Sequence, residues 1–334
     1  MQYSEEDLNR AVKEGIFSAA AVDEFRGQVA SATDSPAADE EHFKLIGGFN
    51  DIFIVIACGL LLFSSFSVLE GVNTSLGYLV FALLSWGLAE FFVLKRKMAL
   101  PAIMLLIAFV GSITGLSHSL LSLETESGAM LAATLSVIAA FVHWQRFSVP
   151  ITVAVAVAAS VGLIISSLIT VFPDMDSWLS PVLFICGILV FAFAMRWDSS
   201  DRTRVNYRSD VAFWIHLLAA PLIIHPIFTG LDILDGEQGL WRMGLVILLY
   251  LLLTFISVCI DRRVFMVSSL IYVIYALSGL IDRYGMVGSS FAFTGVFMGA
   301  MLLLLSAYWQ PVRKLLVSHL PSSIQSSLPK VKYT

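Results

Sequence analysis

The chain has 334 residues, of which 58% are apolar and only 13% are charged, and its mean hydropathy is +0.85. A soluble domain is usually about 45–50% apolar and about 25% charged, so this composition excludes an ordinary soluble protein and indicates a membrane protein. The net charge of −5 says little as a total, because the charges are segregated by segment. The sequence has no basic surface with interleaved aromatic residues, so nucleic-acid binding is not expected.

Residues 1–30 are predicted to form a small helical hairpin on the cytoplasmic side. Ser4 followed by Asp7 resembles a capping box, Gly15 is suited to end the first helix, and Ser18 is suited to cap the second. The hairpin has too little apolar surface for an independent domain, so we expect it to dock on the membrane part or on a cytoplasmic protein partner. The acidic opening MQYSEEDLNR does not predict a secretory signal peptide, so the first span is expected to act as its own insertion signal.

Residues 31–44 are predicted to be a polar, acidic linker, and residues 45–309 a transmembrane helix bundle. A helix that spans the lipid bilayer needs roughly 20 apolar residues, and ten segments are candidates, of which 128–143 is short. They are residues 51–69, 76–94, 99–117, 128–143, 149–171, 178–195, 210–228, 240–259, 264–281 and 290–308. Residues 310–334 follow as a cytoplasmic tail, in which PVRKLLVSHL is predicted to form a short amphipathic helix at the interface.

The placement of basic residues supports ten spans. If the N-terminus is inside, all of the 20 Lys and Arg residues except Arg242 and Arg283 lie on the cytoplasmic side, as the positive-inside rule expects. Omitting the short span 128–143 would turn the loop RWDSSDRTRVNYR and the pair Arg262–Arg263 outward, against this bias. The sequence therefore predicts an all-α polytopic transmembrane bundle with both termini cytoplasmic.

The span 210–228 carries two histidines and two prolines within an apolar run. Pro221 and Pro226 each remove a helical hydrogen bond, which predicts a kink near the middle of the span and a looser outer end. Broken helices near the midplane build substrate and ion sites in many transporters, and histidine can relay protons. His216 and His225 are therefore candidates for a pathway, although nine residues place them on opposite sides of a straight helix. The alternative is that both only form interhelical hydrogen bonds.

Ser268, Tyr272, Tyr275 and Gly279 fall on one face of the span 264–281. Their hydroxyl groups are predicted to face the preceding histidine-containing span and to hydrogen-bond its histidines or freed carbonyls. Packing through small and hydroxyl residues is the alternative.

Glu90 is the one carboxylate clearly inside a predicted span. It is predicted to pair with Lys95, Arg96 or Lys97 by reaching toward the interface, and the alternative is a carboxylate that binds a coupling ion.

The sequence contains no Walker loop, HExxH or GxSxG motif, so no catalytic residue and no enzymatic activity are predicted. Cys58, Cys186 and Cys259 lie in separate apolar runs with neither metal-ligand spacing nor a disulfide pattern. No metal site and no cofactor are therefore expected.

The segment LNRAVKEGIFSAAAVDEFRGQV, followed by DEEHFKLIGGFNDIF and a run of spans, resembles bacterial polytopic membrane proteins of the domain-of-unknown-function kind. The stretches FWIHLLAAPLIIHPIF and IDRRVFMVSSLIYVIYAL are similar to that group as well. The resemblance implies a bacterial inner-membrane location and transfers no activity.

These features lead to two hypotheses of different classes. The first is a secondary transporter-like or permease-like protein for a small solute, with His216, His225 and the face of Tyr272 along its pathway. The second is a non-transporting membrane scaffold or regulator that recruits a partner through residues 1–30.

Overall fold

The computed structural model describes residues 5–22, 25, 49–121, 126–172, 178–202, 204, 206–231, 239–283, 290–325 and 327–330. The secondary structure of these residues is helical, and no strand occurs among them. The chain divides into two compact units, Met1–Lys44 and Leu45–Thr334, which are described separately.

The first unit begins with α1 (Glu5–Lys13). Gly15 follows with φ +73°, a left-handed conformation that glycine adopts at low cost, and it ends the helix as predicted. The Ser18 Oγ accepts a hydrogen bond from the Ala21 N–H at 3.1 Å, so Ser18 caps the start of the second helix, again as predicted. The proposed cap at Ser4 and the linker 31–44 lie outside the described residues.

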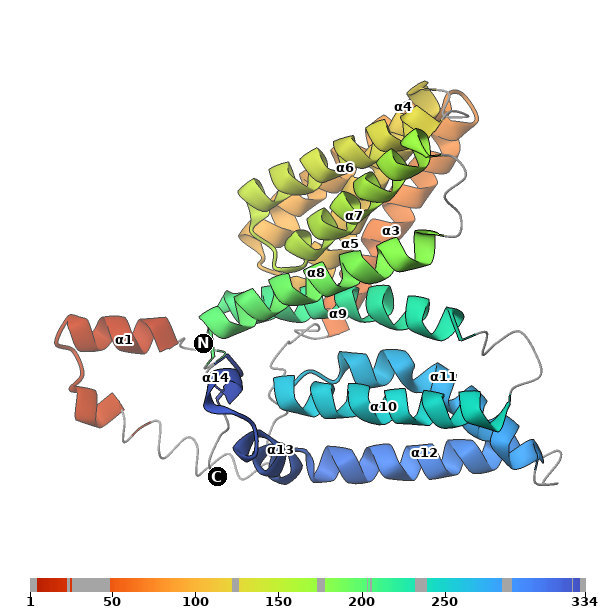
Figure 1. The fold of residues 1–334 in the computed structure, drawn as a ribbon. Helices are drawn as coiled ribbons and strands as arrows, with labels where there is room; N and C mark the ends of the chain where they lie inside the picture. Colours follow the sequence, from red (N-terminus) through yellow and green to blue (C-terminus); the bar gives the residue numbers. More distant parts are fainter. Residues whose placement is uncertain are drawn as a thin grey trace. The chain divides into compact units, whose positions relative to one another are not determined.

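The second unit is a bundle of apolar helices (Figure 1). Its first half comprises α3 (Phe49–Glu70), α4 (Thr74–Ala89), the π-helix η1 (Glu90–Lys95), α5 (Ala99–Leu121), α6 (Glu126–Phe147) and α7 (Ile151–Val171). Its second half comprises α8 (Leu179–Ser200), α9 (Tyr207–Thr229), α10 (Leu240–Ile260), α11 (Val264–Arg283), α12 (Ser290–Ala307), α13 (Trp309–Ser318) and α14 (Ser322–Gln325).

Within the described residues, nine helices are long and apolar enough to cross a membrane, and a tenth is counted if α12 and α13 are one span bent by 72°. The prediction of an all-α polytopic bundle is therefore confirmed. The short fourth span is among the nine, because its helix extends to Phe147 and offers 20 residues from Gly128.

Sequential hairpins form the bundle, and α9 packs against α7, α8 and α11. Gly187 allows the close approach of α8 and α9, because a Cβ there would lie 2.8 Å from the backbone carbonyl carbon of Leu222. Gly115 does the same for α5 and α4, where a Cβ would meet the Tyr78 ring at 2.3 Å. Small residues thus allow close helix contacts at these two places, as is usual in membrane bundles.

The prolines of α9 do not divide it. The helix continues as α-helix from Tyr207 to Thr229 with Pro221 and Pro226 inside it, and the bent pair of helices is α12 with α13. The sequence prediction of a looser outer end is therefore wrong, and the kink near the middle of the helix stays a prediction. The packing of Ala219, Ala220, Ile223 and Ile224, all buried, holds the helix together across Pro221.

Candidate functional site

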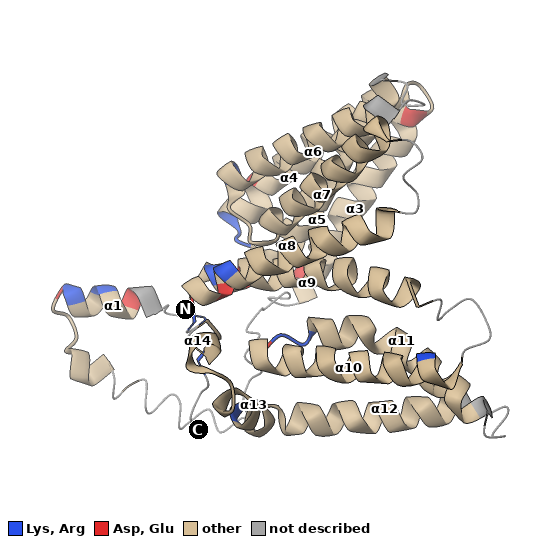
Figure 2. Ribbon diagram, viewed as in Figure 1, with Lys and Arg blue, Asp and Glu red and all other residues tan. Residues whose placement is uncertain are grey.

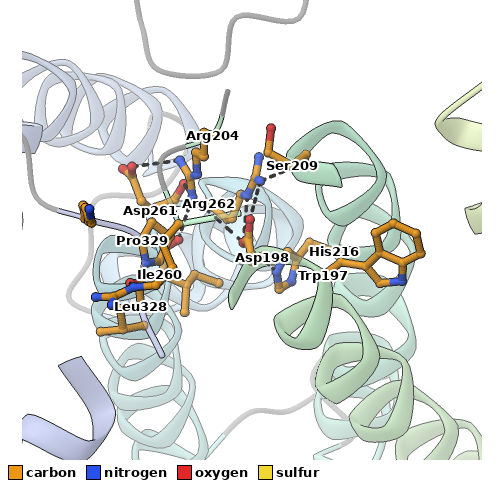
Figure 3. A network of polar contacts seen from close by, with 12 residues as sticks. Trp197, Asp198, Arg204, Ser209, His216, Ile260, Asp261, Arg262, Leu328 and Pro329 are labelled. Carbon is orange, nitrogen blue, oxygen red and sulfur yellow. Dashed lines mark hydrogen bonds and ion pairs between the residues drawn. The ribbon is translucent and has the colours of Figure 1, made fainter. Parts of the chain in front are cut away.

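Asp198 lies in the last turn of α8 with its side chain fully buried. The Arg262 guanidinium, from the turn after α10, donates to both carboxylate oxygens, from Nη2 at 2.8 Å and from Nε at 3.3 Å. The same Nη2 donates to the Ser209 carbonyl at 2.9 Å. The His216 Nε2 lies 3.3 Å from Asp198 Oδ2, within ion-pair distance but without hydrogen-bond alignment. Asp198 thereby joins α8 to α9 and to the α10–α11 turn (Figure 3).

Asp261 is another buried carboxylate in this region. Its Oδ2 accepts a hydrogen bond from Arg204 Nη1 at 2.9 Å, and its Oδ1 accepts one from Trp309 Nε1 at 2.6 Å. The Arg313 Nε lies 3.8 Å from the same Oδ1. Arg204 Nη2 also donates to the carbonyls of Ile260 and Asp261, at 3.0 and 3.1 Å. Asp261 therefore connects the loop after α8 with α13.

A tight turn after α10 lets the adjacent residues Asp261 and Arg262 contact different partners. Asp261 follows α10 with φ +58° and ψ +44°, a left-handed conformation that aspartate tolerates better than most residues. The Arg262 N–H then bonds back to the Ser257 carbonyl at 2.9 Å, and the Ser257 Oγ donates to the Arg262 carbonyl. The reversal directs Asp261 toward Arg204 and Arg262 toward Asp198.

Arg204 lies between the two carboxylates, with Nη2 4.0 Å from Asp198 Oδ2. Burial lowers the pKa of Arg204, and the like charge of Arg262 lowers it further, while Asp198 and Asp261 raise it. Because the pKa is lowered overall, desolvation outweighs pairing at this position. The two carboxylates therefore offset only part of the cost of burying the charged Arg204 guanidinium.

The C-terminal residues close one side of this arrangement. Arg313 Nη2 donates to the Pro329 carbonyl at 2.7 Å, and Arg202 Nε donates to the Leu328 carbonyl at 2.8 Å. The Lys330 N–H bonds to the Arg202 carbonyl at 3.1 Å. The tail is thereby tied to α13 and to the loop after α8.

We call Asp198, Arg204, Asp261, Arg262 and Arg313 the charged cluster. Figure 2 shows that Lys and Arg lie mainly at the ends of the helices of the second unit. The cluster joins the loop after α8, the α10–α11 turn and α13. Chemically it is a network of buried ion pairs that links several helices, which we call an ionic lock, and His216 lies beside it.

Among the predicted pathway residues, the structure brings His225 and Tyr272 together. His225 Nδ1 lies 2.7 Å from the Tyr272 hydroxyl, so the expected contact between the two spans is present. His216 also approaches α11, with its ring centroid 6.1 Å from that of Phe265, but its polar contact is Asp198. The two histidines therefore have separate polar partners.

The remaining candidates are not part of either contact. Ser268 is half-buried, and Tyr275 and Pro221 are exposed on their helices. The face of α11 that is buried contains Phe265, Ser269 and Tyr272. The periodicity placed Tyr272 on the correct face, but Tyr275 lies at its margin.

Glu90 pairs with a different residue from those predicted. Both of its oxygens accept hydrogen bonds at 2.7 Å from Arg146 at the end of α6, one from Nε and one from Nη2. The prediction of pairing with Lys95, Arg96 or Lys97 is therefore wrong, because Arg146 on the neighbouring helix presents its planar fork to the carboxylate.

The charged cluster was not predicted from the sequence. The loop RWDSSDRTRVNYR and the pair Arg262–Arg263 served there only as indicators of topology. The signal that was available is that both segments contain aspartate beside arginine, in WDSSDR and IDRR, directly after an apolar span. Opposite charges in two connections of the same side predict pairing between them.

The fold and its apolar helices define a multi-pass integral membrane protein. Comparisons with protein-family models, curated proteins and solved structures found no match to this chain. Within the described part of the chain, no group of three or more His, Cys, Asp and Glu side chains is arranged to hold a metal ion. The three cysteines are buried and unbridged.

Proposed function

We propose that the protein is a secondary transporter-like or permease-like protein for a small solute, and that the charged cluster is the gate at the cytoplasmic end of its pathway. The observation that carries the proposal is Asp198, a carboxylate with no solvent exposure held between Arg262 and His216 inside a membrane bundle. Ionisable groups are costly in such a place and usually mark a pathway or relay.

The arrangement of the cluster suits a gate. It joins elements that belong to separate hairpins, so breaking its ion pairs would remove the charged connections of α8 and the loop after it to the α10–α11 turn and α13. Salt bridges that repack between two arrangements are a common device of conformational switching. We place the cluster on the cytoplasmic side of a bacterial inner membrane, on the basis of the basic-residue bias and the family resemblance.

Cysteine accessibility tests this gate. In a background lacking Cys58, Cys186 and Cys259, single cysteines replace Ala212 or Ala219, which are fully buried on α9 about one turn before and one turn after His216. Asp198→Asn, which weakens the lock, should increase labelling of both by a membrane-impermeant thiol reagent from the cytoplasmic side.

Leu217→Cys is the matched control, because Leu217 is exposed on the outer surface of the same helix and should not change its labelling. Solute flux into proteoliposomes, measured over a panel of small solutes, then identifies the cargo. Protection of both buried positions with and without Asp198→Asn contradicts the gate.

The second candidate is a scaffold or regulator that recruits a protein through the N-terminal unit. It is favoured by the apolar side chains that this unit exposes, with Ile16 64%, Phe17 50% and Phe25 53% exposed. Exposed apolar groups of this kind mark interaction surfaces. If deleting residues 1–30 changes the cellular phenotype and Asp198→Asn does not, the scaffold is the better description.

A further inference from the structure

An apolar cavity lies between α3, α4 and α5, away from the charged cluster. Its volume is about 580 Å³. Phe66 and Tyr78 line one end, and Leu100, Met104, Ile107 and Gly111 line its length along α5. A cavity of this size and apolar lining suits a hydrocarbon chain rather than a polar solute.

The length of the cavity corresponds to one leaflet of a bilayer. Its α5 residues run from Leu100 to Ser112, a distance of about 18 Å at about 1.5 Å per residue. Half of a hydrocarbon core of roughly 30 Å is about 15 Å. Phe63 and Ile107, at 65% and 56% exposed, show that the cavity is open at the surface of the bundle, where lipid chains can enter.

Three basic residues lie directly before the α5 end of the cavity. Lys95, Arg96 and Lys97 are all exposed, and α5 begins two residues later at Ala99. Lys95 and Arg96 lie over the ring of Phe91, at 5.9 and 5.6 Å from its centroid.

The nearby carboxylate of Glu90 forms its ion pair with Arg146 and not with these three residues. Arg146 already donates to both oxygens of Glu90, and none of the three basic residues forms an ion pair with a carboxylate in the described chain. Basic residues placed next to a span attract anionic headgroups, each adding to the affinity.

We infer that this cavity binds one acyl chain of an anionic phospholipid, whose headgroup is held by Lys95, Arg96 and Lys97. The apolar part and the charge meet at the beginning of α5, as the chain and headgroup of a single lipid require. The occupant comes from the leaflet in which these basic residues lie.

Native mass spectrometry of the purified full-length protein tests the inference. The protein is titrated with phosphatidylglycerol and, separately, with phosphatidylcholine carrying the same two oleoyl chains. The dissociation constant of the first bound phosphatidylglycerol should be at least about tenfold lower than that of the first bound phosphatidylcholine. Equal affinities would overturn the inference.

Two variants locate the binding. Replacing the basic residues (Lys95→Gln, Arg96→Gln and Lys97→Asn) should abolish the preference; asparagine is chosen because Lys97 has φ +53°. Gly111→Leu should remove the tight site for both lipids, because a Cβ at Gly111 meets nothing within 4 Å and the new side chain has room to occupy the cavity.

Each variant has a matched control. Arg196→Gln, Arg208→Gln and Lys314→Gln together remove three exposed charges beside other helices, and should keep the preference. Gly162→Leu adds the same side chain on α7, where a Cβ also meets nothing within 4 Å, and should keep the tight site. If the controls lose binding as much as the variants do, or if the variants keep it, the inference is wrong.

Discussion

The helices α3–α7 and the helices α8–α13 both carry ion pairs near the ends of their spans, but in different surroundings. In the first half, Glu90 and Arg146 meet with side chains that are 35% and 52% exposed. In the second half, Asp198 meets Arg262 with side chains that are 0% and 4% exposed. The two pairs have similar geometry, with closest distances of 2.7 and 2.8 Å.

The difference shows that the geometry of an ion pair does not by itself decide how much the pair contributes to the stability of the protein. An exposed pair contributes little, because water or headgroups replace the partner when one is removed. A buried pair leaves an uncompensated charge when one partner is lost. The same kind of ion pair therefore contributes little to stability in the first half of the bundle and is costly to break in the second half.

The largest expected effect comes from breaking the buried pair. Asp198→Ala should lower the free energy of unfolding by about 3–5 kcal/mol, since it leaves Arg262 buried without its carboxylate. Unfolding by denaturing detergent, followed by circular dichroism in mild detergent, measures this change.

Glu90→Gln is the matched control in the first half and should cause a much smaller loss, because both partners there reach solvent. If the two substitutions destabilise the protein equally, the distinction between the halves fails.

The C-terminal tail offers a second test of the half α8–α13, because arginines there donate to backbone carbonyls of the tail as well as to carboxylates. A chain ending at Gln325 removes the acceptors of Arg313 at Pro329 and of Arg202 at Leu328. We expect a loss of about 1–3 kcal/mol, since a buried guanidinium keeps fewer partners. A chain ending at Lys330 retains these acceptors and should unfold as the full chain does; equal losses for both truncations would contradict this role of the tail.

Helix contacts offer a test that does not involve charge. Gly187→Ala should destabilise the protein by about 1–3 kcal/mol, because its Cβ would lie 2.8 Å from Leu222 backbone on α9. Gly111→Ala, in α5, meets no atom within 4 Å and should be close to neutral. The same unfolding measurement compares them, and a neutral Gly187→Ala would mean that α8 and α9 are less closely packed than described.

The smallest expected effect concerns the two histidines of α9. Tyr272→Phe and His225→Ala should be coupled by about 0.6 kcal/mol in a double-mutant cycle of unfolding, the usual scale of an interhelical hydrogen bond in a membrane bundle. Tyr272→Phe and His216→Ala should be additive, because the polar contact of His216 is Asp198. Coupling between Tyr272 and His216 instead would indicate one shared site.

The sequence predicted the spans well, because the length and apolarity of a span are local properties. The helix containing residues 128–143 was the hardest case, and the basic residues around Arg146 and Arg262 decided it correctly. The contact of Tyr272 with α9 was also predictable, since helical periodicity places it on one face. The looser outer end expected of this helix was not found, because α9 stays helical to Thr229 despite Pro226.

The sequence by itself determined that this chain is an all-α membrane bundle, since the spans follow from apolar length. Only the tertiary structure decided which charges meet. Arg262 is 64 positions from Asp198, and Arg146 is 56 positions from Glu90. Pairing at such separations depends on how helices pack, and packing also sets whether a pair is exposed or buried. That burial, which no local pattern records, is what makes Asp198 the centre of the candidate site.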